Sequence, residues 1–546
     1  MRLNFDGVLY LLEKIKINTR SRRSFASLMR EMKTTIFCLC ALTSLFLSFP
    51  STATASDYKL GIVVVVDQFR ADYLMRFRSQ FKGGYKMLLE KGAYLPLADH
   101  GLMQNMTGPG HAAILTGSYP YRNHVSINYW FDREANKKTY CVQDDSVQIL
   151  STGGVVIDAA MGISPRNLNA STLGDELKNV DRPSRVVSVS LKDRAAVLLG
   201  GRRTDHTVWF DEPHCQWVTS TFFEKALPAF ALSENEVLKR ERNQTFSWGP
   251  FKDIKKCSFE SLPTPWGIEK TFALANAAMD EMKLGSGRDT DLLEISLSSP
   301  DYLGHRVGPN SPFMEQMTLA EDRLLGDFLA TVAKKLPGGL NDVFVVLTGD
   351  HGMLPTALPK EKVDSENVSL APIAKRVEDR LTEVFGKPKG GEWIKSILEF
   401  QFYFSDEAIR DKKLKKEEVY AVAREKILKE PSVDAVWLKD EIMRDRKLPP
   451  GELGLIADHT LSERNGDLIP IFKPYFYTDT SIYSHMTHYS YDRYVPLVFM
   501  GKTFKPGTYR QIVHVVDIAP TLASILHVIP PSQSEGRVIT EILREK

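Results

Sequence analysis

The sequence has few cysteines, which limits both its disulfides and its metal chemistry. Five cysteines occur in 546 residues, and only Cys141, Cys215 and Cys257 follow residue 55. Three cysteines cannot all pair with one another, and none of them has the Cys-x-x-Cys spacing of a thiolate metal site. Cys215 and Cys257 lie in the same polar segment. We therefore predict that these two form a disulfide in an oxidising compartment.

An excess of charge of one sign is also absent. The formal net charge is +2, too close to neutral to indicate a nucleic-acid or membrane-surface partner. Any recognition of a charged ligand must therefore be confined to a local site. The composition, 43% hydrophobic and 25% charged, is that of a globular protein, and the length allows at least two structural units.

A long hydrophobic run is missing as well. The apolar run near the N-terminus covers residues 36–49, which is short for a membrane span. It follows Met32 and Lys33 and precedes an Ala-x-Ala site at residues 53–55. These features predict a signal peptide cleaved after Ala55, and hence a secreted, periplasmic protein. An uncleaved anchor is the alternative, and Met32 is an alternative start to Met1.

Five short apolar runs predict buried strands. If the residues that directly follow each run are included, the runs cover residues 61–67, 185–191, 292–301, 344–352 and 495–501. Continuous apolar runs are typical of parallel strands that are buried on both faces. Helical patterns, for example at residues 312–336 and 519–526, lie between or after them. This alternation predicts an α/β fold with a mostly parallel central sheet and helices on both faces.

Two regions lack this alternation. Residues from about 200 to 270 are rich in Trp, Phe, Pro and charge, and residues from about 360 to 480 mix charged helical stretches with aromatic runs. We predict that both are insertions that cap the sheet. They would belong to one domain, residues 56–546, that follows the N-terminal extension and signal peptide, residues 1–55.

Carboxylates and imidazoles follow several predicted strands. Asp67, Asp301 and Asp350 come at strand ends, where ligands bind in open parallel sheets. Asp350 is followed by His351, and Asp301 precedes His305 by four residues, so that one helical turn can aim both at the same ion. Each pair alone is as well explained by a turn or a surface ion pair. Together with a later pair of histidines they predict two metal ions with open positions for substrate.

A lone hydroxyl residue, Thr107, lies in a predicted loop. The small residues 112–117 that follow it are interpreted as the start of a helix. A threonine alcohol is a poor nucleophile at neutral pH unless a base or a metal ion takes its proton. The metal ligands predicted above would supply that activation.

These motifs resemble the alkaline phosphatase superfamily, and within it the PafA-like phosphatases with a threonine nucleophile. Their pattern Thr-x-Pro-x-His, followed by Thr-Gly, is matched at residues 107–111 and 116–117, and the similarity extends to residues 515–521. The resemblance implies an alkaline phosphatase-like catalytic domain, with Thr107 as the nucleophile that carries a phosphothreonine intermediate. It also implies two Zn²⁺ ions, one held by Asp67, Thr107, Asp350 and His351 and the other by Asp301, His305 and one C-terminal histidine.

That C-terminal histidine has two candidates. The corresponding pattern in these phosphatases is His-Gly-Ser-Pro-Tyr-x-Tyr-Asp, followed by two further residues and then by Val-Pro. Counting back from residues 491–496 without a gap places the ligand at His485, whereas His488 requires a deletion of three residues. The chain has Met-Thr-His where the pattern has Gly-Ser-Pro. We favour His485, although both imidazoles are able to bind zinc.

Three further residues separate monoester from diester chemistry. The resemblance implies that Lys192, Arg194 and Asn128 contact the phosphoryl oxygens. A monoester dianion has two charges and three non-bridging oxygens, so it gains more from an ammonium and a guanidinium than a diester does. The resemblance therefore implies an enzyme that hydrolyses small phosphate monoesters. A phosphodiesterase or nucleotide pyrophosphatase of the same superfamily is the alternative, and an inactive secreted metal-binding protein is a second.

Overall fold

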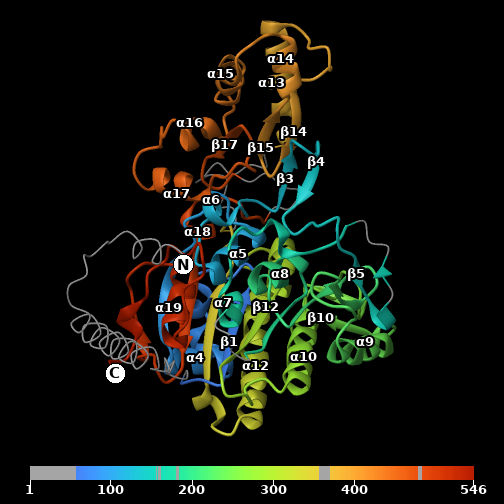
Figure 1. Ribbon diagram of the computed structural model, residues 1–546, viewed down its shortest axis with the longest axis vertical. Coiled ribbons are helices and arrows are strands. Elements are labelled where there is room, and N and C mark those ends of the chain that lie inside the picture. Colours follow the sequence, from blue (N-terminus) through green and yellow to red (C-terminus); the bar gives the residue numbers. More distant parts are fainter. Residues whose placement is uncertain are drawn as a thin grey trace, which may run out of the picture. The chain divides into compact units, whose positions relative to one another are not determined.

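A central sheet of twelve strands organises the fold in the computed structural model, which describes residues 57–154, 156–157, 161–179, 184–355, 369–476 and 483–545 (Figure 1). Five adjacent strands pair in parallel, in the order β13 (Val343–Gly349), β1 (Leu60–Val66), β12 (Asp291–Leu297), β7 (Val186–Ser190) and β8 (His206–Asp211). All residues of the first four strands are buried, as their apolar sequences require. The predicted α/β fold with a mostly parallel sheet is confirmed.

The strands that flank this parallel core on its two sides are antiparallel to it. β18 (Tyr494–Met500) pairs antiparallel with β13 and with β2 (Ala93–Asp99), and β9 (Gln216–Ser220) pairs antiparallel with β8. The interpretation of residues 495–501 as another parallel strand was therefore wrong, because an apolar run records burial but not strand direction. The short strands β19 (Gly507–Thr508), β20 (Val513–His514), β5 (Ile149–Leu150) and β6 (Val156–Ile157) complete the edges.

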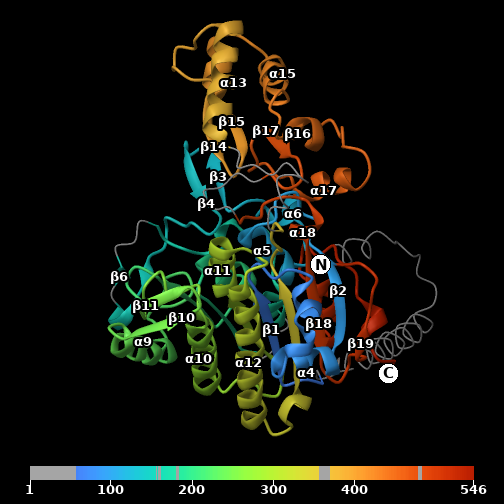
Figure 2. The ribbon, with the colours of Figure 1, turned by 180° about the vertical axis from the view of Figure 1, so that it is seen from behind.

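Helices cover both faces of the sheet, and β1 shows how the sequence divides between them. Ile62, Val64 and Val66 pack in one hydrophobic cluster with α4 (Gly84–Lys91), α10 (Pro265–Met282) and α12 (Pro312–Lys335). Val63 and Val65 point to the other face, whose cluster includes α5 (Thr107–Thr116), α7 (Leu173–Asn179) and α19 (Ile518–Leu526). Figure 2 shows the sheet from behind, with α4, α10 and α12 labelled. The period-two alternation of side chains thus gives the sheet two separate cores.

A second, smaller sheet lies between β13 and β18 in the chain. Its four antiparallel strands are ordered β14 (Ile394–Leu398), β15 (Gln401–Phe404), β17 (Leu468–Phe472) and β16 (Val433–Leu438). The amphipathic helices α13 (Leu370–Phe385) and α15 (Lys416–Ile427) pack with it around a hydrophobic cluster of its own. We call this sheet and its helices the small lobe. It occupies most of the predicted insertion at residues 360–480.

The predicted insertion at residues 200–270 is of mixed character. Its strands β8 and β9 extend the central sheet, whereas α9 (Ala229–Glu241) and the hairpin of β10 (Thr245–Trp248) and β11 (Phe251–Lys255) do not belong to that sheet. Cys215 and Cys257 form a disulfide in this region, with their Cα atoms 5.3 Å apart, which confirms the predicted pair. Cys141 is buried and unpaired.

The N-terminal predictions concern residues that lie outside the described part of the chain. The signal peptide, its cleavage after Ala55 and the choice between Met1 and Met32 therefore stay predictions. Among the described residues, no helix is both long enough and apolar enough to cross a membrane.

Reduction of the Cys215–Cys257 disulfide should lower the free energy of unfolding by up to about 4 kcal/mol, because a cross-link between residues 42 apart in sequence restricts the unfolded chain. Guanidinium denaturation followed by tryptophan fluorescence, with and without reductant, measures this difference. The variants Cys215→Ser and Cys257→Ser should resemble the reduced protein and should not respond to reductant. If reductant lowered the free energy of unfolding of the double variant Cys215→Ser/Cys257→Ser as much as that of the wild-type protein, the assignment of this stabilisation to the disulfide would be contradicted.

Candidate active site

Three aligned strands bring acidic residues to one edge of the central sheet. Val66, the last residue of β1, is in register with Leu297 at the end of β12 and with Gly349 at the end of β13. Asp67 and Asp350 follow directly, and Asp301 lies in the first turn of α11 (Ser299–Val307), which begins just after β12. The strand register therefore places three carboxylates together.

The first group consists of Asp67, Asp350 and His351, all fully buried. His351 Nε2 lies 3.5 Å from Asp67 Oδ1 and 3.5 Å from Asp350 Oδ2, and none of these three atoms has a hydrogen-bond partner among the described residues. The His351 Nδ1–H donates to the Gly352 carbonyl at 2.9 Å, so the lone pair of Nε2 faces the carboxylates. Three converging acceptors without a proton between them fit a cation, and this set of donor atoms suits zinc.

The second group forms around Asp301. His305 Nε2 lies 3.2 Å from Asp301 Oδ1, and His485 Nε2 lies 3.8 Å from the same oxygen. Both rings are oriented by backbone carbonyls, since His305 Nδ1 donates to Tyr483 O at 2.8 Å and His485 Nδ1 to Asn105 O at 2.6 Å. In both rings Nε2 faces Asp301 Oδ1, and histidine ligands of metal ions typically have the other ring nitrogen hydrogen-bonded in this way. The structure thus assembles the predicted trio.

The two candidate histidines occupy different environments. The ring of His485 stacks on that of His351 with centroids 3.8 Å apart, so that His485 joins the two groups. His488 instead contacts the ring of Tyr489, with centroids 4.1 Å apart, and lines a small cavity under the small lobe. Of the two alternatives, the geometry brings His485 to Asp301.

Lys192 connects the two groups. Its buried ammonium lies 2.5 Å from Asp67 Oδ2 and 2.6 Å from Asp301 Oδ2. Burial disfavours the charged form, but Asp301 and Asp67 outweigh burial and raise the pKa of Lys192. Lys192 was expected at the phosphoryl oxygens. Here its charge is balanced by the carboxylates, and contact with substrate stays a prediction.

Thr107 is the first residue of α5 and lies beside the other two predicted phosphoryl contacts. Arg194 Nη2 is 3.3 Å from Thr107 Oγ1, and Arg194 Nη1 is 3.3 Å from the Tyr140 hydroxyl. The Gly108 N–H donates to Asn128 Oδ1 at 2.9 Å, which leaves the amide N–H groups of Asn128 as donors for another partner. An anion next to Thr107 would therefore meet a guanidinium, an amide and the positive end of a helix dipole.

The helix begins earlier than predicted. The interpretation of Thr107 as a loop residue before a helix at residue 112 was wrong, because α5 starts at Thr107 and ends at Thr116. The first turn of a helix tolerates Pro109 and glycine, since its N–H groups have no partner within the helix. Gly110 is required for close packing: a Cβ atom there would lie 2.1 Å from the Asp350 carbonyl oxygen. This contact holds the start of α5 against the end of β13.

Two residues that support the site were not identified from the sequence. His111, noted only as part of the threonine motif, bonds through Nε2 to Ser296 Oγ at 2.8 Å and lies 3.3 Å from Asp350 Oδ2. Gln68 donates its backbone N–H to Asp350 Oδ1 at 3.0 Å and its side-chain amide to Asp301 Oδ1 at 2.8 Å. Such contacts orient metal ligands. The position of His111 one helical turn after Thr107 was a usable signal, whereas nothing in the sequence marked Gln68.

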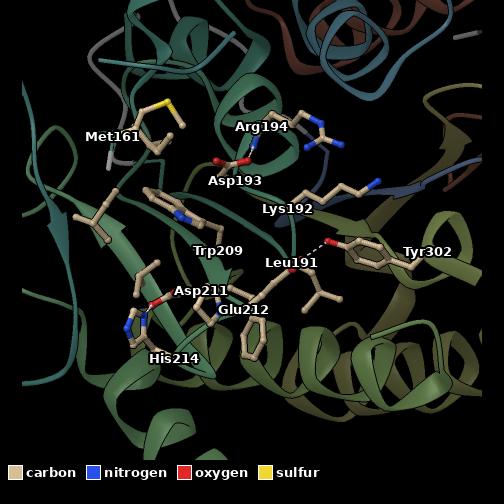
Figure 3. A pocket seen from close by; sticks show the side chains of 15 residues that line it. Met161, Leu191, Lys192, Asp193, Arg194, Trp209, Asp211, Glu212, His214 and Tyr302 are labelled. Atoms are coloured by element: carbon tan, nitrogen blue, oxygen red, sulfur yellow. Dashed lines mark hydrogen bonds and ion pairs between the residues drawn. The ribbon is translucent and has the colours of Figure 1, made fainter. Parts of the chain in front are cut away.

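A cavity of about 490 Å³ borders the segment that carries Lys192 and Arg194. Figure 3 shows the Lys192 side chain extending away from Trp209, which lines the cavity below Asp193. Tyr302, next to Asp301 in α11, donates its hydroxyl to Glu212 at the turn after β8. This bond connects α11 to the hairpin of β8 and β9.

Comparisons with known proteins agree with this geometry. The family model "Type I phosphodiesterase / nucleotide pyrophosphatase" matches residues 61–490. The alkaline phosphatase PafA of Elizabethkingia meningoseptica is 33% identical, over 89% of this chain and 94% of that protein. The alkaline phosphatase PhoV of Synechococcus elongatus is 31% identical, over 91% and 94%. A Myroides odoratus protein named calcium-transporting ATPase is 30% identical, over 94% and 99%.

Solved structures give the same result. The crystal structure of wild-type PafA has a TM-score of 0.81 and 31% identity, and the match covers 89% of this chain and 99% of that one. Murine ectonucleotide pyrophosphatase/phosphodiesterase 5, at 15% identity and a TM-score of 0.52, shares the fold. The chain therefore belongs to the type I phosphodiesterase/nucleotide pyrophosphatase family, and it is an enzyme of the alkaline phosphatase superfamily, as its motifs predicted.

Proposed function

We propose that this protein is a zinc-dependent phosphomonoesterase that acts through a phosphothreonine intermediate. The observation that carries the proposal is the position of Thr107 Oγ1, 3.3 Å from the Arg194 guanidinium at the start of a buried helix. A hydroxyl nucleophile and a guanidinium that can bind a phosphoryl group are adjacent there. Two groups of possible metal ligands, Asp67 with Asp350 and His351, and Asp301 with His351 and His485, lie at the same sheet edge. The alkaline phosphatases named above support the same activity.

Two zinc ions are proposed as cofactors. Asp67, Asp350 and His351, with Thr107, would hold one ion, and Asp301, His305 and His485 would hold the other. Carboxylate and imidazole donors fit zinc, and the unpartnered atoms of the first group need a cation. When bound, the ions would lower the pKa of the Thr107 hydroxyl and neutralise negative charge on the departing oxygen.

The chain's own residues account for the remaining steps. Thr107 Oγ1 gives up its proton to solvent and attacks phosphorus, the bond from phosphorus to the ester oxygen breaks, and the alcohol leaves with a proton taken from water. Water then attacks the phosphothreonine, the bond from phosphorus to Oγ1 breaks, and inorganic phosphate is released. Arg194, the Asn128 amide and Lys192 would hold the non-bridging oxygens through both displacements.

Hydrolysis of diesters is the second candidate function, because the matching family model carries that name. Arg194, beside Thr107 Oγ1, favours monoesters instead, as would Lys192 if its ammonium, which pairs with Asp67 and Asp301, also reaches the phosphoryl group. A monoester presents a dianion to them, whereas a diester brings one charge less and a second bulky group. We therefore place monoester hydrolysis first.

We also propose a secreted, periplasmic location, with residues 56–546 as the mature catalytic domain and the small lobe as a cap. The signal-peptide pattern supports this proposal. The disulfide between Cys215 and Cys257 is consistent with it, because such bonds persist in oxidising compartments. The expected substrates are small phosphate monoesters.

Replacing the nucleophile tests the proposal directly. Thr107→Ala should lower kcat for p-nitrophenyl phosphate by about 10³-fold or more and abolish covalent phosphorylation, because no alkoxide is available. Thr107→Ser keeps a hydroxyl and should remain phosphorylated. Intact-mass spectrometry after an acid quench detects the added phosphoryl group. A phosphorylated Thr107→Ala protein with normal turnover would contradict the assignment.

Monoester preference should depend on Lys192 and Arg194. The double variant Lys192→Ala/Arg194→Ala should lose about 10²-fold more kcat/KM for p-nitrophenyl phosphate than for bis-p-nitrophenyl phosphate. Lys239→Ala/Arg240→Ala, which removes the same two charge types from an exposed part of α9, is the matched control and should change neither rate. Equal losses for both substrates would favour the diesterase.

Zinc content distinguishes the two C-terminal histidines. The wild-type chain should hold two zinc ions after dialysis, and His485→Ala should hold about one, because the second group loses one of its three protein ligands. His488→Ala should still hold two. Plasma mass spectrometry of the dialysed proteins gives the zinc content per chain. If His488→Ala lost zinc and His485→Ala did not, His488 would be the ligand instead of His485.

A further inference from the structure

One arginine contacts the chain on both sides of Asn128. Arg464 lies in the loop that connects α17 (Glu452–Thr460) to β17 of the small lobe. Its Nη1 donates to the His124 carbonyl at 2.7 Å, and its Cζ lies 4.4 Å from the centroid of the Trp130 ring. His124 comes four residues before Asn128, and Trp130 two residues after it. Arg464 therefore brackets the residue proposed to bind a phosphoryl oxygen.

The loop that leads into Asn128 needs a restraint of this kind. It begins where α6 (Pro120–Asn123) ends at His124, whose φ of 65° is left-handed. A residue other than glycine is strained in this conformation and depends on its surroundings to keep it. Arg464 holds the carbonyl of this residue. Two residues further on, Ser126 Oγ lies 3.1 Å from Ser462 Oγ, so the same two loops meet at a second point.

Other bonds hold Asn128 from the opposite side. The strand that follows it, β3 (Tyr129–Asp132), pairs antiparallel with β4 (Lys137–Tyr140). The Cys141 N–H donates to the Asn128 carbonyl at 2.8 Å, and the Gly108 N–H donates to Asn128 Oδ1 at 2.9 Å. These bonds fix the backbone and one atom of the amide. The direction in which the amide N–H groups point then depends on the loop before Asn128.

The loop that carries Arg464 is itself braced by the small lobe. The Tyr403 hydroxyl of β15 donates to the Arg464 carbonyl at 2.9 Å. Lys439 Nζ donates to the Asn465 carbonyl at 3.0 Å, and the Ser462 N–H donates to Asn465 Oδ1 at 2.8 Å. Figure 2 shows β3 and β4 beside the small-lobe strands β14 and β15. Arg464 thus transmits the position of the small lobe to the loop before Asn128.

The surroundings of Arg464 supply geometry and little compensation for its charge. Its described partners are the carbonyls of His124 and Asn167, the latter at 2.8 Å, and the Trp130 ring. Burial lowers the pKa of Arg464 to about 10. An uncharged side chain would avoid this unfavourable burial. A guanidinium, however, can donate within its plane while it stacks on a ring, which a flexible ammonium cannot reproduce.

We infer that Arg464 is a positioning residue that directs the Asn128 amide towards the phosphoryl group. The inference rests on the proposed phosphomonoesterase function, in which Asn128 binds a non-bridging oxygen. Without Arg464, His124 and Trp130 would shift, and the amide between them would move with the backbone. A displacement of this kind can cost up to about 10²-fold in rate. The small lobe therefore contributes to phosphoryl binding through a contact outside the reacting atoms.

The experiment is a double-mutant cycle of Arg464 and Asn128 in the full-length protein, measured as kcat/KM for p-nitrophenyl phosphate. Arg464→Ala should lower kcat/KM by about tenfold, because the amide is misplaced. In the Asn128→Ala background the same substitution should cost less than about twofold, because the group that Arg464 positions is gone. Equal losses in both backgrounds would overturn the inference, as would unchanged kcat/KM in Arg464→Ala.

A conservative variant keeps the test decisive if Arg464→Ala does not fold. Arg464→Lys retains the charge and one hydrogen bond but not the planar stack on Trp130. It should lower kcat/KM by about threefold in the wild-type background and leave it unchanged in the Asn128→Ala background. A loss of the same size in both backgrounds would contradict a role through Asn128.

Arg133→Ala is the matched control. Arg133 joins the same hairpin to the small lobe, since its Nη1 donates to the Phe404 carbonyl at 3.1 Å and its Nη2 to Asp467 Oδ2 at 2.6 Å. Its loss should lower Tm at least as much as Arg464→Ala, because Asp467 is left buried without its partner. It should change kcat/KM by less than about twofold in either background. A loss that disappears with Asn128→Ala would indicate general loosening of the hairpin and overturn the specific role of Arg464.

The choice of ester separates this inference from the proposed function. A wild-type protein that hydrolyses only bis-p-nitrophenyl phosphate would overturn the proposed monoesterase. The same cycle measured with that diester would still test Arg464, because a diester also presents non-bridging oxygens to Asn128. A protein that hydrolyses neither ester would overturn both.

Discussion

Three carboxylates buried at one edge of the central sheet impose the main constraint on this structure. Asp67 and Asp350 are fully buried and Asp301 is 5% exposed. Ionised carboxylates in such surroundings are unfavourable unless cations or hydrogen bonds compensate them. The ammonium of Lys192 and the N–H groups of Gln68 supply part of this compensation, and the proposed metal ions would supply the rest at the carboxylate oxygens that have no hydrogen-bond partner among the described residues. The chemistry proposed for the protein depends on the same concentration of negative charge, because that is what retains metal ions.

Close backbone packing also fixes the position of Thr107, the proposed nucleophile, relative to these carboxylates. The start of α5 rests on the end of β13 because Gly110 leaves room for the Asp350 carbonyl, and a Cβ atom at Gly108 would lie 2.7 Å from Asn128 Oδ1. The small residues around Thr107 thus hold its hydroxyl at the same sheet edge as the carboxylates. Mobility at this point would separate Thr107 from Arg194, so a rigid helix start suits the proposed chemistry better than a loop.

Much of the architecture was predictable from local patterns. The runs at residues 61–67 and 344–352 became the parallel strands β1 and β13, and the helix predicted at residues 312–336 was observed at Pro312–Lys335. These features depend on burial and periodicity, which are local properties of a sequence. The direction of β18 and the start of α5 were predicted wrongly. Strand direction depends on connections elsewhere in the chain, and glycine and proline indicate a loop unless the packing that requires them is known.

The sequence by itself determined the fold class, the Cys215–Cys257 pair and the set of acidic and imidazole residues at strand ends, since these follow from residue type, spacing and burial. The spacing in the sequence favoured His485 over the chemically similar His488, but only the tertiary structure decided that His485 lies beside Asp301 while His488 contacts Tyr489. It alone revealed that Gln68 donates hydrogen bonds to Asp301 and Asp350, which lie 233 and 282 residues away in the chain. Contacts between distant segments depend on packing, and no local pattern records them.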